Sequence, residues 1–263
     1  MKIQPITAND FVEIDAIKPS DWPSIIPHLQ YYVNAPSCHP IKLVENGNII
    51  GIGNTILHKN TAWLSHIIVN EEHRGKGLGT TITQALIDSV PSSYKTILLI
   101  ATELGEYVYN KLGFVTETEY VAFKEVKIES PTSPLIQPFD EKFRADLHSM
   151  DTAIFGENRF DTLNPYLAQA QVFIQNNQVK GFYVPTFGEG LIIAETEEAG
   201  TELMKYRLKS NGLCLFPMEN AAATNFLETN NFSPLKRIKK MRLGEKIEWQ
   251  PQNVYNRVGG NFG

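Results

Sequence analysis

The sequence predicts an α/β protein with mixed sheets, built from two units. Its 263 residues exceed the length of one average domain. Segments with apolar residues at alternate positions occur along the chain between segments with apolar residues at helical spacing. Residues 129–139 contain three prolines and are typical of a linker. We therefore expect one unit at residues 1–128 and a second at residues 140–263.

The first half contains the clearer patterns. The Asn46-Gly47-Asn48 turn between two apolar runs predicts a hairpin. The run Thr96–Ala101 is almost entirely apolar, as expected for a strand covered on both faces. The expected elements are a strand at 2–6, helices after Thr7 and near Asp21, strands at 40–45, 49–57 and 62–69, a helix ended by Pro91, a strand at 95–101, a helix at 103–112 and two strands within 114–126.

The second half repeats this order only weakly. The expected elements are a helix at 140–154, a hairpin at 171–184, a strand at 191–194, a helix at 199–209, a strand at 212–216, a helix at 220–230, a strand at 235–243 and a polar tail at 244–263.

Composition argues against nucleic-acid, membrane and metal partners. The formal net charge is -5, and the basic run Lys236–Arg242 carries apolar residues at the spacing of an amphipathic strand. Cys38 and Cys214 are too far apart in sequence for a disulfide framework or a metal motif. The N-terminus has no apolar signal region, and the longest apolar run is strand-sized. We expect a cytoplasmic protein; its oligomeric state cannot be read from the sequence.

The segment between the strand at 62–69 and the following helix has the residues of an anion site. Its glycines permit close backbone approach and positive φ angles, so several N–H groups can converge on one anion. The positive end of the helix and two cationic side chains would add to the attraction. The segment is Arg74-Gly75-Lys76-Gly77-Leu78-Gly79-Thr80.

Spacing separates three phosphate motifs here. A Walker A loop is excluded by two mismatches. Gly77 follows Lys76 where the motif requires Ser or Thr, and Asn70 stands where its first glycine would be. A dinucleotide fingerprint fails because Thr80 stands at the position of its last glycine. The spacing that fits is Arg-x-x-Gly-x-Gly, with Arg74, Gly77 and Gly79.

With this loop, residues 1–128 resemble the GNAT superfamily of N-acetyltransferases. A second landmark agrees, because Tyr109-Asn110-Lys111-Leu112-Gly113-Phe114 matches the family's Tyr-x-Lys-x-Gly-Phe. The resemblance implies the acyl-CoA N-acyltransferase fold and acetyl-CoA as cosubstrate, without a metal. It implies that the pantetheine arm pairs with backbone groups of Ile67, Ile68 and Val69, between two strands that splay apart. The inferred pyrophosphate contacts are Arg74, Gly75, Lys76, Gly77, Leu78, Gly79 and Thr80.

The resemblance also implies catalytic roles. Tyr109 would protonate the departing CoA thiolate. The base that accepts the proton of the amine is left open. His66 lies on the fourth strand, but strand alternation predicts that it faces away from Ser65, Ile67 and Val69, so we expect a structural role. A water chain or a residue of the second half remains possible as the base.

The second half resembles the degenerate half of a tandem GNAT protein. It has no Arg-x-x-Gly-x-Gly loop, and its counterpart segment Ala194–Glu198 is acidic, so we expect no CoA there. Tyr255 and Asn256 of the tail are candidates to fold over the acceptor pocket. The motifs that carry this likeness are Phe155-Gly156 with Arg159, Pro217 with Asn220 and Ala223, and Arg242 with Gly244.

The sequence therefore predicts an N-acetyltransferase acting on a primary amine that it does not identify. The competing hypothesis is a non-catalytic acyl-CoA-binding or sensing protein, motivated by a hydroxyl at Ser65 where related enzymes carry a carboxylate or imidazole. A protein-interaction module without affinity for CoA is a third possibility.

Overall fold

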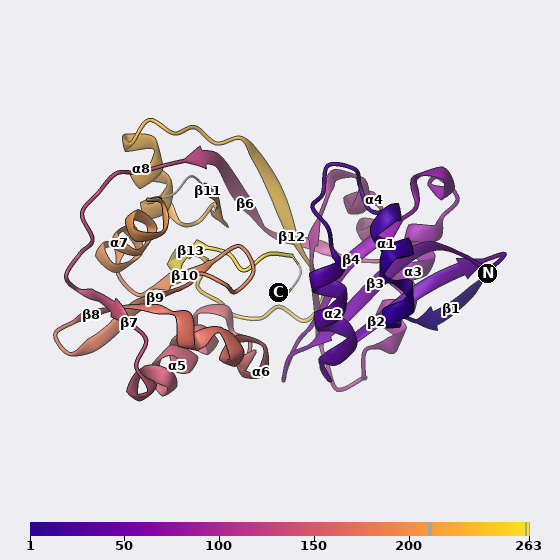
Figure 1. Cartoon of the computed structure of the whole chain (residues 1–263), viewed down its shortest axis with the longest axis horizontal. Helices are drawn as coiled ribbons and strands as arrows, with labels where there is room; N and C mark the ends of the chain where they lie inside the picture. Colours follow the sequence, from indigo (N-terminus) through magenta and orange to yellow (C-terminus); the bar gives the residue numbers. More distant parts are fainter. Residues whose placement is uncertain (210–211, 261, 263) are drawn as a thin grey trace. The chain divides into compact units, whose positions relative to one another are not determined.

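The computed structural model describes residues 1–209, 212–260 and 262, and it divides the chain into two compact units (Figure 1). Unit 1 comprises Met1–Val115, Met241–Glu245 and Gly260–Gly263. Unit 2 comprises Thr116–Lys240 and Lys246–Gly259.

Unit 1 is a mixed sheet with helices on both faces. Strands β1 to β4 are antiparallel neighbours in chain order, and β5 pairs with β4 in parallel. The sheet approaches α3 closely, because a Cβ at Gly51 would lie 2.6 Å from Ile82 Cδ1. The elements are β1 (Lys2–Pro5), α1 (Phe11–Ile17), α2 (Ile26–Asn34), β2 (Cys38–Glu45), β3 (Asn48–Leu57), β4 (Ala62–Val69), α3 (Leu78–Ser89), β5 (Thr96–Ala101) and α4 (Glu103–Lys111).

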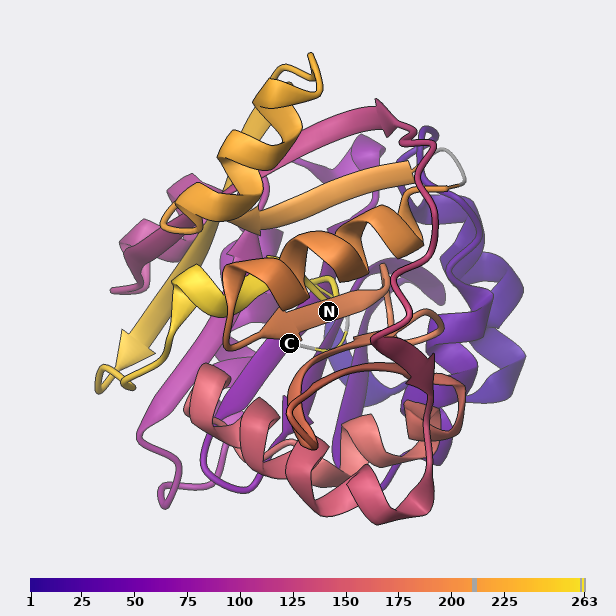
Figure 2. The same cartoon turned by 90° about the vertical axis from the view of Figure 1, so that its left-hand side faces the viewer.

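Unit 2 contains a five-stranded antiparallel sheet in the order β13-β10-β9-β8-β7. Helix α7 packs on β9 and β10 (Figure 2), and β11 pairs antiparallel with β6. The elements are β6 (Val115–Val126), β7 (Ile136–Pro138), α5 (Arg144–Phe155), α6 (Phe160–Leu163), β8 (Gln171–Gln175), β9 (Gln178–Val184), β10 (Leu191–Ala194), α7 (Glu197–Arg207), β11 (Gly212–Pro217), α8 (Ala221–Thr229) and β13 (Val254–Asn256). Strand β12 (Lys236–Gly244) begins in unit 2, and its last four residues belong to unit 1.

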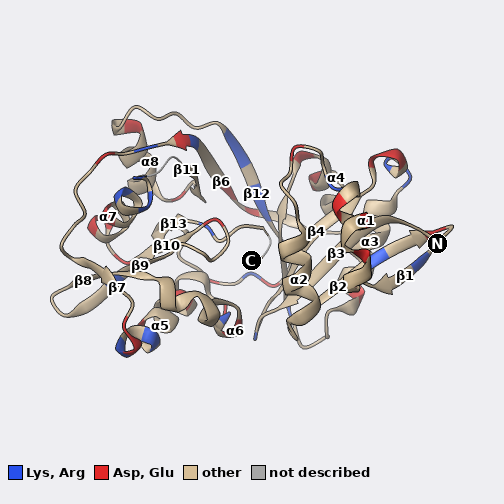
Figure 3. Ribbon diagram, viewed as in Figure 1, with Lys and Arg blue, Asp and Glu red and all other residues tan. Residues whose placement is uncertain are grey.

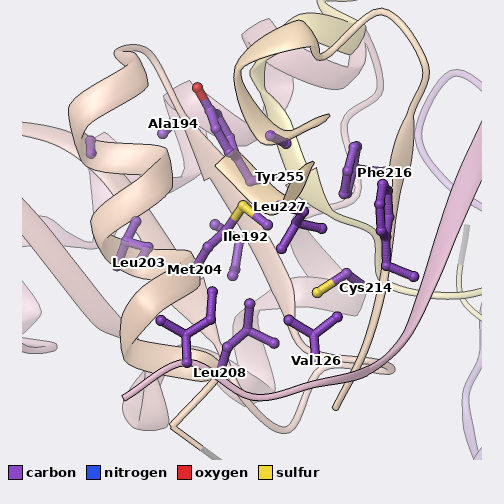
Figure 4. Packing of buried hydrophobic residues seen from close by; sticks show 14 of the residues in the cluster. Val126, Ile192, Ala194, Leu203, Met204, Leu208, Cys214, Phe216, Leu227 and Tyr255 are labelled. Carbon is purple, nitrogen blue, oxygen red and sulfur yellow. The ribbon is translucent and has the colours of Figure 1, made fainter. Parts of the chain in front are cut away.

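Each unit has its own apolar core. In unit 1, Leu64 of β4 and Leu99 of β5 pack with Leu78 and Leu86 of α3. In unit 2, Ile192 of β10 and Met204 of α7 pack with residues of β6, β11 and α8 (Figure 4). Each core therefore lies between a sheet and the helix that follows its fourth antiparallel strand.

The structure confirms the predicted α/β class and corrects three elements. Residues 115–126 form one twelve-residue strand, β6, rather than two. The expected linker at 129–139 contributes β7, which pairs with β8. The tail expected to be polar contains the buried strand β13; its residues Asn261 and Gly263 lie outside the described part of the chain.

The basic run is a strand, as predicted. It forms β12, which carries the Lys and Arg residues visible in Figure 3. Lys240 is buried, and its Nζ lies 3.0 Å from Glu117 Oε2. Within the described residues, no helix combines the length and apolar character needed to cross a bilayer.

Candidate functional site

The free edge of β4 is the first component of the site. β4 pairs with β5 only through Ala62, Trp63 and Leu64, yet it continues to Val69. The two strands therefore separate after Leu64, which is the splay that the resemblance implies.

Backbone polar groups of β4 point into this opening. The Asn70 N–H donates to Ile50 O at 3.0 Å, toward β3. Because antiparallel strands alternate the direction of these groups, Val69 and Ile67 present theirs to the opposite edge, whereas Ile68 pairs with β3. Arg74 Nε donates to Val69 O at 3.3 Å, so this side chain already contacts the edge and orders the loop.

The glycine loop leads from this edge into α3. Gly75 and Gly77 have φ angles of 78° and 77°, and a Cβ on either would meet no atom within 4 Å. The first intrahelical bond joins the Thr81 N–H to Gly77 O, so the N–H groups of the three preceding residues lack intrahelical acceptors. Lys76 is exposed beside them. The loop thus has the open space, free donors and positive charge that a pyrophosphate requires.

A β-bulge interrupts β4 just before this edge. Asn54 opposes Ser65 and Ile52 opposes Ile68, so His66 and Ile67 together oppose a single residue of β3. His66 has a φ of 46°, a left-handed conformation that a residue with a side chain rarely adopts. The extra residue breaks the alternation of side chains along the strand.

The prediction that His66 faces away from Ser65 is therefore wrong. The Tyr32 hydroxyl lies 2.7 Å from His66 Nδ1, and Ser65 Oγ donates to the same hydroxyl at 3.4 Å. Asn54 Nδ2 donates in turn to Ser65 Oγ at 3.2 Å. All four side chains are buried, and they form one hydrogen-bonded chain on the face of the sheet that α2 covers.

Aromatic rings surround His66. The Trp22 and His28 rings lie 6.1 and 5.1 Å from it, centroid to centroid. Phe262, near the end of the chain, packs on His28 at 5.9 Å and on Tyr31 at 5.1 Å. The part of the tail that reaches this cluster is thus Phe262, whereas Tyr255 and Asn256 lie in unit 2.

Burial lowers the pKa values of both histidines in this cluster. Burial, together with the neighbouring His28, lowers the pKa of His66 to about 3. Burial also lowers the pKa of His28. The His66 imidazole is therefore neutral at physiological pH, and it lacks the pKa near 7 that suits a general base.

Tyr109 lies on α4, which adjoins the first turn of α3. A Cβ at Gly79 would lie 3.6 Å from Val108 Cγ2, which brings α4 beside the glycine loop. Burial raises the pKa of Tyr109 to about 12, so its hydroxyl keeps its proton at neutral pH. Its ring packs closely against Gly105, where a Cβ would approach Tyr109 Cε2 to 2.7 Å.

The corresponding positions of unit 2 have structural roles. Thr196 caps α7 through a bond from the Ala199 N–H, and the first turn carries two glutamates. Arg159 is fully buried and pairs with Asp151 at 2.8 Å. Asn220 caps α8.

Sequence reasoning missed the residues around His66. Tyr32, Trp22 and Asn54 belong to three separate segments and share no spacing motif with the glycine loop. The available signal was a polar residue within an otherwise apolar strand, namely Asn54 in β3, which is 1% exposed.

Among known proteins, one family model matches part of the chain, and several solved structures have a similar fold. Residues 17–128 match the family model of the acetyltransferase (GNAT) domain. A candidate acetyltransferase from Pyrococcus horikoshii is 19% identical with a TM-score of 0.85, covering 100% of this chain and 95% of that one. A GNAT-type N-acetyltransferase from Sphaerobacter thermophilus is 12% identical with a TM-score of 0.63, covering 95% and 98%. At these identities the two structures establish a shared fold across both units.

Proposed function

We propose that the chain transfers acetyl from acetyl-CoA to a primary amine, because residues 17–128 match the family model of the acetyltransferase (GNAT) domain. The observation that carries the proposal is the continuous path from the free edge of β4 to the open glycine loop. The backbone groups of a free strand edge can hydrogen-bond the amides of the pantetheine arm, and the N–H groups of the loop can bind the pyrophosphate. The two sites follow one another in the chain at Val69 and Arg74–Thr80.

The path also indicates where the reaction would occur. With the pyrophosphate at the start of α3, the pantetheine arm would extend along β4 from Val69 toward Ser65. Four residues of strand span roughly 13 Å. The thioester would then lie near the bulge at His66, where β4 and β5 begin to separate.

Tyr109 is the proposed acid. The neutral amine nitrogen attacks the carbonyl carbon, the carbon–sulfur bond breaks, and the nitrogen releases a proton to solvent as the amide forms. The sulfur takes the Tyr109 proton, which solvent replaces. A phenol with a pKa of about 12 is a weak acid for a thiolate whose thiol has a pKa of roughly 8.5 in water. Desolvation raises the proton affinity of the thiolate as well, which narrows this difference.

We assign His66 a positioning role rather than that of a base. Its Nδ1 is hydrogen-bonded to Tyr32, and its pKa of about 3 makes it a poor proton acceptor. The acceptor amine would lose its proton to solvent before it attacks. The cluster of Trp22 and His28 around His66 would form the acceptor side of the reaction centre.

The low pKa of His66 also favours the competing function, an acyl-CoA-binding or sensing protein. A site without a base of suitable pKa can hold a thioester without turning it over. Release of free CoA, followed with a thiol reagent in the presence of a panel of primary amines, separates the two functions. Amine-dependent release with a matching acetylated product supports the enzyme; binding without release supports the sensor.

A pair of glycine variants tests the proposed cradle. Gly77→Asp places a carboxylate among the free N–H groups, so acetyl-CoA affinity should fall by about 100-fold or more, because like charges there repel the pyrophosphate. Gly47→Asp is the matched control, since Gly47 has a φ of 86° and open surroundings but lies in the β2–β3 turn. Equal affinity of both variants and the unaltered chain would overturn the assignment of this loop.

A further inference from the structure

Strand β13 lies between β10 and β11 in unit 2. It pairs antiparallel with β10, with Ile192 opposite Asn256 and Ile193 opposite Val254. On its other side the Arg257 N–H donates to Leu215 O of β11 at 2.8 Å. These two strands of unit 2 are thus bridged by a segment from the end of the chain.

The Asn256 side chain completes this bridge. Its Oδ1 accepts from the Leu215 N–H at 3.0 Å, and its Nδ2 donates to Gly190 O at 2.7 Å. Asn220 Nδ2 donates to Val254 O at 3.0 Å. Both asparagines are buried, so these bonds satisfy polar groups that water cannot reach.

β10 and β11 are the unit 2 counterparts of β4 and β5. In each unit a helix follows the fourth strand of an antiparallel run, and the next strand precedes a second helix. The order β4-α3-β5-α4 of unit 1 thus corresponds to β10-α7-β11-α8 of unit 2. The place taken by β13 therefore corresponds to the opening between β4 and β5.

The start of α7 is closed as well. The Tyr255 ring lies so close to Gly200 that a Cβ there would approach Tyr255 Cζ to 2.1 Å. Figure 4 shows this ring beside Ile192 and Leu227 in the unit 2 core. Thr196 caps the helix, and Glu197 and Glu198 give its first turn negative charge. No anion is favoured at such a terminus.

We propose that residues Val254–Asn256 are a built-in peptide ligand that fills the unit 2 counterpart of the acyl-CoA opening. The inference rests on the proposed function of unit 1 for the identity of that opening. The bound strand supplies unit 2 with hydrogen bonds and buried surface that a cofactor arm would otherwise supply. Unit 2 is accordingly complete without CoA, and acetyl-CoA stabilises unit 1 alone.

Hydrogen exchange of the full chain, followed by mass spectrometry, tests this assignment. Acetyl-CoA should slow exchange in peptides covering residues 62–81 and leave those covering 191–200 and 212–217 unchanged. Asn256→Ala should speed exchange at 212–217 on the order of tenfold, because Leu215 loses its acceptor. Gln252→Ala, at an exposed residue just before β13, is the control and should change neither region.

Two outcomes overturn the proposal. Protection of 191–200 by acetyl-CoA would mean that unit 2 takes the cofactor. Unchanged exchange at 212–217 in Asn256→Ala would mean that β13 does not hold β11. If the chain bound no acetyl-CoA, the proposed function would fail, but the Asn256 comparison would still be decisive. If Asn256→Ala proved unfolded, the acetyl-CoA comparison on the unaltered chain would decide.

Discussion

Helices α3 and α7 occupy equivalent places in the two units but begin in opposite ways. At α3, Gly77 leaves the first turn uncapped and open; at α7, Thr196 caps it and Tyr255 covers Gly200. Four residues after each N-cap, the Thr81 N–H bonds Gly77 O and the Gly200 N–H bonds Thr196 O. The difference shows that an anion site depends on what the first turn leaves free, and not on the fold that carries it.

Helices α4 and α8 show the same contrast at the proposed acid. The Phe114 N–H donates to Tyr109 O and the Phe232 N–H donates to Leu227 O, both at 3.0 Å. Tyr109 therefore corresponds to Leu227, a buried core residue. Unit 1 therefore has a hydroxyl group at this position, whereas unit 2 has an apolar side chain that packs in its core.

The largest expected effect is on the stability of unit 2. Gly200→Ala should reduce the free energy of unfolding by roughly 3 kcal/mol, because its Cβ would overlap the Tyr255 ring. A glycine-to-alanine change inside a helix normally stabilises by about 1 kcal/mol. A decrease in the free energy of unfolding would therefore in itself indicate the overlap with Tyr255. Urea denaturation measures the change. In a Tyr255→Ala background the same substitution should cost little, and an equal cost there would contradict the close packing.

A second prediction concerns the acid of unit 1. Tyr109→Phe should lower kcat about 100-fold, the usual loss on removal of a general acid, while acetyl-CoA affinity stays within about twofold. Tyr107→Phe, at an exposed position of the same helix, should leave kcat unchanged. A normal rate in Tyr109→Phe would show that the hydroxyl serves packing only, as Leu227 does in unit 2.

The glycine loop and Tyr109 could be predicted because each motif is local. Their residues lie within a few positions of one another, so spacing alone identifies them. β13 could not be predicted in this way. Asn256 resembles any polar tail residue, and its role depends on Leu215 and Gly190, which lie 41 and 66 positions away. Long-range pairing of this kind leaves no local pattern.

The bulge explains the error about His66. Alternation predicts a side chain's face only while every residue has one partner across the ladder. The additional residue in β4 removes that condition, and no glycine marks the left-handed position at His66. Before the bulge the alternation holds, because Ala62 and Leu64 both lie in the core under α3.

The pH dependence of turnover tests whether unit 1 lacks a base. His66 has a pKa of about 3 and Tyr109 a pKa of about 12, so neither titrates between pH 6 and 9. The fraction of neutral amine increases about tenfold per pH unit below the amine's own pKa of ~10, and kcat/KM should increase by the same factor. A plateau above about pH 7 would instead indicate an imidazole base.

The smallest effect is on the stability of unit 1. Because the folded-state pKa of His66 is depressed, the unfolded chain binds a proton that the folded chain does not. This contribution is complete above pH ~6.5 and is lost as the pH falls toward about 3, by at most about 1.4 kcal/mol per pH unit. His66→Asn, which tolerates the left-handed backbone, should show a shallower loss in urea denaturation between pH 7.5 and 5.5. An unchanged slope would mean that His66 is not buried in the neutral form.

The most direct test of the contrast between the units is the number of acetyl-CoA molecules bound per chain, measured by isothermal titration calorimetry. One molecule, lost in Gly77→Asp and retained in Gly47→Asp, is the predicted result. Two molecules per chain, or one that survives Gly77→Asp, would contradict the account of an open unit 1 and a unit 2 filled by β13.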